Sequence, residues 1–131
     1  MLIDTNIFLE IILEQEKADE ARRLLSKTEE HEFFLSDYSL HSIGLLLFRR
    51  KQHEVFRQFI NDMIFHAGMR MMTVPIQAIV SLIDTAQRFN LDFDDAYQYV
   101  VAEKYGLEII SFDADFDRTE KGRRSPAEAG K

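Results

Sequence analysis

Acidic side chains stand at three places in this sequence where one predicted element of secondary structure gives way to the next. One acid directly follows the apolar start MLI, two lie in LDFDDAYQYV, and three lie in IISFDADFD. These acids are Asp4, Asp94, Asp95, Asp113, Asp115 and Asp117. Taken singly, each has a structural explanation, since Asp is common at helix starts and in turns. Taken together, converging carboxylates repel one another unless a hard cation such as Mg²⁺ or Mn²⁺ binds them, and such a site activates water against a phosphodiester.

The rest of the sequence predicts the elements that would bring these acids together. Short apolar stretches indicate strands at 2–4, 32–35, 70–74 and 107–111, and helical spacing of apolar residues indicates helices at 6–14, 16–26, 37–49, 54–66, 75–90 and 93–105. Strands separated by one or two helices form parallel sheets with crossover connections. We therefore predict one domain over residues 1–131, a three-layer α/β/α sandwich with a central parallel sheet. The polar segment 118–131 is predicted to be a loose tail.

Composition narrows the classes of function. The chain has 131 residues, a formal net charge of −7 and no cysteine. The negative charge argues against a protein that clamps duplex DNA by charge alone, and the lack of cysteine excludes disulfides and thiolate metal sites. The four histidines show no metal-motif spacing, and no segment is apolar for long enough to span a membrane. A cytoplasmic protein without a membrane segment is the natural expectation.

Three motifs in order give the sequence a family resemblance. DTN follows the first strand, DDA opens a late helix, and SFDADF follows the last strand. This set, from Leu2 to about Phe116, resembles the PIN-domain family, which includes the VapC-type toxins. The resemblance implies a parallel sheet flanked by helices, ribonuclease activity that depends on Mg²⁺ or Mn²⁺, and frequent homodimers. It also implies that toxin members bind a small antitoxin protein.

The resemblance also implies which acids form the site. Asp4 matches the first acid of the family, Asp95 the third and Asp113 the fourth. These three residues would be catalytic and would hold the metal ion. Asp115 is a further metal ligand or an alternative to Asp113, because the family varies at this position.

Four other residues would support the acids, and one of them marks a departure from the family. Asn6 matches a polar residue that steadies the first acid by hydrogen bonding, and Asp94 would be a flanking charge or helix cap. The second family acid is normally a glutamate, but Ser42 stands at its position. A shift of one residue would offer His41 instead, and an imidazole would suit Mn²⁺ better than Mg²⁺.

Two functions therefore stay open at this point. The first is a metal-dependent ribonuclease in which three acids suffice, and the second is a PIN-like module that has lost catalysis and binds RNA or protein. Ser42 favours the second function, whereas the other acids favour the first, because unpaired carboxylates that serve no chemistry would only destabilise the fold. A haloacid-dehalogenase-like phosphatase is a remote third possibility, since Asn6 stands where its second aspartate belongs.

Overall fold

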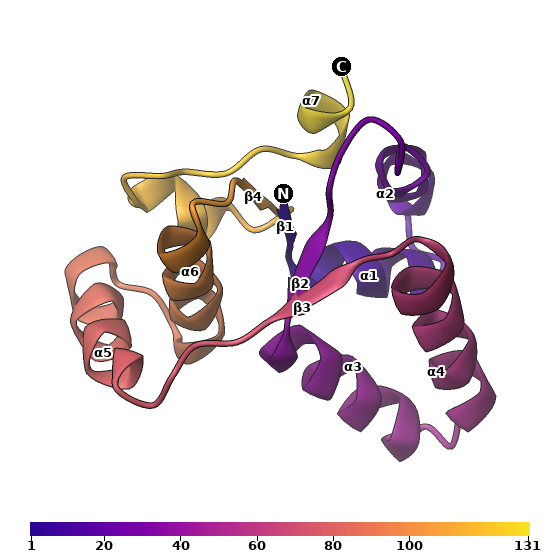
Figure 1. The fold of residues 1–131 in the computed structure, drawn as a ribbon, viewed down its shortest axis with the longest axis horizontal. Coiled ribbons are helices and arrows are strands. Elements are labelled where there is room, and N and C mark those ends of the chain that lie inside the picture. The colour runs from indigo at the N-terminus through magenta and orange to yellow at the C-terminus, as the bar shows by residue number, and fades with distance from the viewer.

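Four short parallel strands form the centre of the molecule (Figure 1). The computed structural model describes all 131 residues. The sheet has the order β3-β2-β1-β4, and its strands are β1 (Leu2–Ile3), β2 (Phe34–Ser36), β3 (Arg70–Met72) and β4 (Ile109–Ile110). Every pair of neighbouring strands is parallel. Helices flank this sheet, so the predicted fold class is confirmed.

Successive side chains along each strand point to opposite faces of the sheet, and each face carries its own apolar core. Leu2, Phe34 and Ile109 belong to one core, whereas Ile3, Leu35 and Ile110 belong to the other. The helices over the first core are α5 (Ala78–Phe89) and α6 (Phe93–Tyr105). Those over the second core are α1 (Thr5–Ile12), α2 (Ala18–Leu25), α3 (Asp37–Arg49) and α4 (His53–Ile60). Figure 1 shows α5 and α6 on one side of the strands and α1, α2 and α4 on the other.

The chain reverses its direction across the sheet between β1 and β4. It proceeds outward from β1 to β2 and β3, and then returns past β1 to form β4 on the other side. Crossover connections are right-handed, so connections in opposite directions lie on opposite faces of the sheet. The carboxyl ends of β1 and β4 therefore border the crevice where open α/β sheets bind ligands.

Capping residues fix the two helices that lead into this crevice. The Ser36 side chain accepts a hydrogen bond from the Ser39 backbone at the start of α3, and Asp92 accepts one from the Asp95 backbone at the start of α6. Gly106 ends α6 with a φ of 65°, a left-handed conformation that suits glycine. These helix boundaries agree with those predicted from the sequence.

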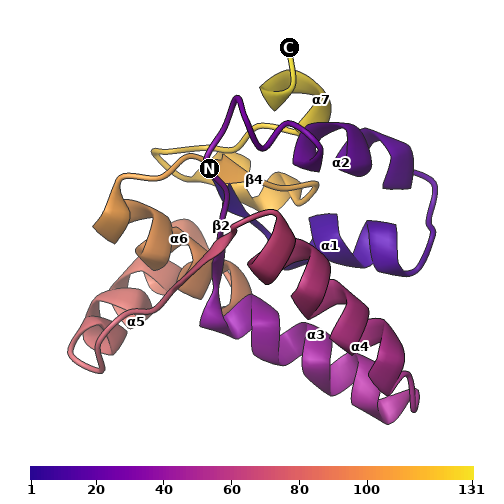
Figure 2. The ribbon, with the colours of Figure 1, turned by 45° about the vertical axis from the view of Figure 1, so that its right-hand side comes forward.

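The helix pair α3 and α4 is antiparallel and packs closely (Figure 2). Gly44 permits this packing, because a Cβ atom there would lie 3.0 Å from the Phe56 ring. A single helix was predicted over 54–66, whereas the structure ends α4 at Ile60 and continues as a π-helix, η1 (Asn61–His66). The wider turn places the Ala67 amide 2.9 Å from the Asp62 carbonyl, five residues back. No helix in the chain combines the length and apolar character needed to cross a membrane.

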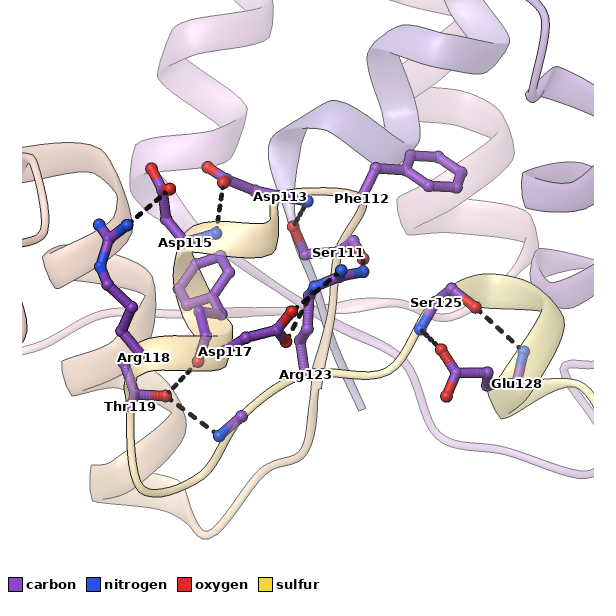
Figure 3. Close-up of polar contacts among 12 residues, drawn as sticks. Ser111, Phe112, Asp113, Asp115, Asp117, Arg118, Thr119, Arg123, Ser125 and Glu128 are labelled. Carbon is purple, nitrogen blue, oxygen red and sulfur yellow. Dashed lines mark hydrogen bonds and ion pairs between the residues drawn. The ribbon is translucent and has the colours of Figure 1, made fainter.

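The prediction of a loose tail after Arg118 is wrong. The 3-10 helix η2 (Ala114–Arg118) leads to a segment in which Arg124 pairs with Ile110, its amide lying 3.0 Å from the Ile109 carbonyl. The short helix α7 (Pro126–Ala129) follows, and Ser125 and Glu128 form its reciprocal capping box (Figure 3). The polar composition of this segment did not indicate that it is ordered. Its polar side chains cap α7 and form ion pairs, while the small Ala129 is buried in the core that includes α2.

Substitutions on α7 test whether this segment is docked. Ala129→Gln should lower the free energy of unfolding by about 2–4 kcal/mol, because a longer polar side chain would be forced into a packed, buried position. The matched control is Ala127→Gln on the exposed side of the same helix, which should change stability by less than about 0.5 kcal/mol. Urea unfolding measures both values. Equal effects of the two substitutions would show that the segment is loose.

Candidate metal centre

A cavity of about 250 Å³ opens at the carboxyl ends of β1 and β4, and its lining is strongly acidic. The carboxylates that line it are Asp4, Asp92, Asp94, Asp95 and Asp113. The other lining residues include Asn6, Tyr38 and Ser42, and none of the ten is basic. The structure thus brings Asp4, Asp95 and Asp113 to one cavity, although they are far apart in the sequence.

Asp4 is buried and firmly held. Only 6% of its surface is exposed. Its Oδ1 atom accepts hydrogen bonds from the Thr5 amide (2.8 Å) and from Gln98 Nε2 (2.9 Å), while Oδ2 accepts one from Ser111 Oγ (2.7 Å). Burial raises the pKa of Asp4, whereas the hydrogen bonds from Ser111 and Gln98 oppose this rise because they stabilise the charged form. Asp4 also caps α1, so the structural and chemical explanations of this residue both apply.

Ser111 joins the first acid to the last. Its hydroxyl donates to Asp4 and accepts from the Asp113 amide at 2.9 Å and from Asn6 Nδ2 at 3.2 Å. Asn6 also accepts a hydrogen bond from the Phe112 amide through Oδ1. Asn6 therefore steadies Asp4 indirectly, by holding Ser111 and the backbone after β4.

Asp95 is the residue that best indicates a bound cation. The residue is 5% exposed, and its Oδ2 atom is buried without any hydrogen-bond partner. Burial and the neighbouring Asp113 carboxylate raise the pKa of Asp95 to about 8. Buried polar atoms are nearly always paired, and a bound cation would pair a carboxylate oxygen that has no hydrogen-bond donor in an acidic cavity. The residues present therefore suit a divalent cation.

Asp113 and Asp115 lie side by side at the start of η2 (Figure 3). Each of Asp95, Asp113 and Asp115 offers a carboxylate oxygen, and the three oxygens lie within 4.8 Å of one another. Asp115 also binds Arg118 at 2.9 Å and does not line the cavity. There are thus two possible groups of metal ligands, and Asp95 and Asp113 belong to both. Asp4 is the third acid of the group that lines the cavity, and Asp115 is the third acid of the more compact group.

The position of the missing glutamate faces the same cavity. Ser42 lines it, and the Tyr38 side chain one turn earlier lies next to Ser42 and Asp94. Burial and the Asp94 carboxylate raise the pKa of Tyr38, so its phenol keeps its proton. His41 is exposed and lines a separate apolar groove, so the expectation that it supports the acids is wrong. One residue along a helix turns the side chain by about 100°, which explains why Ser42 and His41 face different surfaces.

The sequence analysis missed Gln98 and Ser111. Gln98 is completely buried, and its amide also donates to Ser39 Oγ at 2.7 Å. The available signal was its position three residues after Asp95, which places both on one helix face within an otherwise apolar stretch. Ser111 offered a weaker signal, since a single serine after a strand has many roles.

The charge of Asp95 should make stability depend on pH. Its pKa is higher in the folded state than in the unfolded state, so the stability it confers when protonated is lost as the pH rises through about 8. In EDTA, wild type should therefore lose about 1–3 kcal/mol relative to Asp95→Asn between pH 5 and pH 8.5. Urea unfolding at both pH values measures this, with the exposed Asp84→Asn as control. If the difference in unfolding free energy between wild type and Asp95→Asn were the same at both pH values, ionisation of Asp95 would not be its cause.

Gln98 should act on the site through Asp4. In Gln98→Met, Asp4 loses a hydrogen bond that stabilises its charge, so its pKa should rise further and Mn²⁺ affinity should fall about 10-fold. Carboxyl-carbon NMR titration and Mn²⁺ titration measure the two effects. Gln87→Met, on the exposed surface of α5, is the matched control. Loss of stability with an unchanged pKa of Asp4 would reduce Gln98 to a packing role.

Comparisons with known proteins agree with this geometry. A sequence profile of the PIN domain matches residues 1–122. A search of curated protein sequences found no significant match. Among solved structures, the chain is similar to a toxin–antitoxin complex from Klebsiella pneumoniae, with a TM-score of 0.74 and 19% identity over 97% of this chain and 98% of that chain. It is also similar to VapC20 of Mycobacterium tuberculosis, a toxin that cleaves the sarcin–ricin loop, with a TM-score of 0.72 and 20% identity over 88% of this chain and 92% of that one. At such identities the structures show a shared fold, and together with the profile match they lead to one conclusion: this chain belongs to the PIN-domain family.

Proposed function

We propose that this chain is an endoribonuclease of the VapC-toxin type that depends on Mg²⁺ or Mn²⁺. The observation that carries the proposal is the buried, unpartnered Oδ2 atom of Asp95 in a cavity lined by five aspartates and no basic residue. A purely structural acidic cluster would leave this repulsion unrelieved, whereas a divalent cation would balance it.

Some of the residues would bind the cation, and others orient the carboxylates that bind it. Asp95 and Asp113 are the principal ligands, with Asp4 and Asp115 as the further carboxylates available to the ion. Ser111 and Gln98 keep Asp4 oriented, and Asn6 holds Ser111. When bound, the cation supplies Lewis-acid activation of the phosphodiester and of water. Since this chemistry needs no nucleophilic side chain, Asp4, Asp95 and Asp113 are the catalytic residues of the proposal.

RNA is the proposed substrate because of the family and because VapC20, which shares the fold, cleaves the sarcin–ricin loop. Two arginine side chains at η2 and just after it could contact the phosphates of RNA, although the chain has a net charge of −7. Arg118 is bound to Asp115, and Arg123 to Asp117 (Figure 3). We place the activity in the cytoplasm, which suits a chain without cysteine.

We extend the proposal to protein partners. The Klebsiella pneumoniae structure is a toxin–antitoxin complex, and a groove between α3 and α4 offers this chain a surface for an apolar antitoxin helix. Leu45 and Phe48 line that groove and are each 54% exposed. A homodimer is also proposed, and the exposed Ile76, just before α5, and Val80, in its first turn, offer a second apolar surface for it.

A second candidate function is a PIN domain without catalysis that acts by binding RNA or protein. The observation that favours it is Ser42, which leaves the cavity without a carboxylate from α3. The same experiment separates the two candidates.

The decisive assay is cleavage of structured and single-stranded RNAs in the presence of Mn²⁺, Mg²⁺ or EDTA. Wild type should cut with a divalent cation and not in EDTA, and Asp95→Asn should cut at least about 100-fold more slowly because it removes a ligand present in both candidate groups. The control Asp84→Asn removes the same charge from the exposed surface of α5 and should retain full activity.

The outcomes distinguish the candidates directly. Cleavage by Ser42→Glu but not by wild type would identify a degenerate site and favour the binding module. If neither protein cuts any RNA, the nuclease proposal fails. Cleavage that survives both EDTA and Asp95→Asn would show that the acidic cavity is not the active site.

A further inference from the structure

We propose that Asp94 supplies, from α6, the carboxylate that α3 lacks at Ser42. This inference rests on the proposed function, because it concerns the same cation. Asp94 thereby becomes a further metal-site residue instead of a flanking charge.

Asp94 and Ser42 belong to the lining of one cavity although they come from different helices. Ser42 comes from α3 and Asp94 from the first turn of α6, and both line the acidic cavity. Tyr38 bridges the two, since its side chain lies beside both Ser42 and Asp94. A serine side chain is short and uncharged, so it brings no carboxylate into this cavity, and one from α6 can take that place.

Asp94 is free to take this role, whereas its neighbour Asp92 is already engaged. Asp92 Oδ1 accepts a hydrogen bond from the Asp95 amide at 3.0 Å and so begins α6. Asp94 makes no such capping bond, and its side chain is exposed, so its charged form costs little to maintain.

The unpartnered Oδ2 atom of Asp95 supplies the independent observation. It is buried in the same cavity, directly after Asp94 in the chain. A cation held there needs further oxygen ligands from the surrounding walls, and hard cations take six or more. The competing explanation is that Asp94 only complements the positive end of α6, an effect that requires no ligand nearby.

Mn²⁺ titration followed by the electron paramagnetic resonance signal of the free ion tests the proposal without requiring cleavage. Asp94→Asn should bind Mn²⁺ about 10–100-fold more weakly than wild type. Asp92→Asn removes the same charge two residues earlier in the chain while keeping the cap, since Asn caps as well as Asp, and should weaken binding by less than about threefold. Asp84→Asn controls for the loss of a distant charge. Equal effects of Asp94→Asn and Asp92→Asn would overturn the proposal.

Ser42→Glu provides a second, reciprocal test. If Asp94 replaces a carboxylate at position 42, Ser42→Glu should raise the Mn²⁺ affinity of Asp94→Asn by about 10-fold or more. The same substitution in the wild-type protein should change Mn²⁺ affinity by less than about threefold. Equal gains in both backgrounds would show that the positions act independently and would overturn the inference. If wild type and Asp95→Asn both fail to bind Mn²⁺, the proposed metal-dependent function falls, and this inference falls with it. Binding that is lost in Asp95→Asn but unchanged in Asp94→Asn would overturn this inference alone.

Discussion

Repulsion among carboxylates governs the centre of this molecule. Five aspartates line one cavity without a basic side chain, and the burial of Asp4 and Asp95 strengthens the repulsion because water screens it poorly there. The fold satisfies Asp4 with three hydrogen bonds but leaves one oxygen of Asp95 without any. Burial and the neighbouring Asp113 carboxylate raise the pKa of Asp95, so its charged form is disfavoured without a cation. Carboxylates that repel one another when no cation is bound, and whose charge a cation would neutralise, have the properties of a metal site.

The order of the strands imposes this repulsion on the chain. The crossovers change direction between β1 and β4, so the segments after these strands, with Asp4 and Asp113, must meet at one crevice. The cap of Asp92 then directs the first turn of α6, and with it Asp95, into the same space. Ser111 locks the two strand ends together by binding Asp4 and the Asp113 backbone at once. The site is therefore a consequence of topology, and its precision comes from a few buried hydrogen bonds.

Local patterns in the sequence were enough to predict the parallel sheet, the bounds of α3 and α6 and the convergence of three acids. They depend on neighbours a few positions away, such as the glycine that closes α6 at position 106. Features that depend on distant contacts escaped prediction. Gln98 looked like one polar residue in an apolar helix until the fold placed it against Asp4, and the tail looked loose until Ala129 was seen to be buried with the α2 side chains. The resemblance named Ser42 as a departure, but only the cavity showed which side chains surround it.

If these carboxylates share a cation, anomalous diffraction from crystals grown with Mn²⁺ should reveal it. We expect an anomalous peak within bonding distance of Asp95 Oδ2 and of an Asp113 carboxylate oxygen. The peak should vanish when EDTA replaces Mn²⁺. An empty cavity in crystals that bind Mn²⁺ elsewhere, with Asp95 protonated and hydrogen-bonded to Asp113, would contradict this expectation. The acids would then be a strained structural cluster, and the search for function would move to the apolar surfaces.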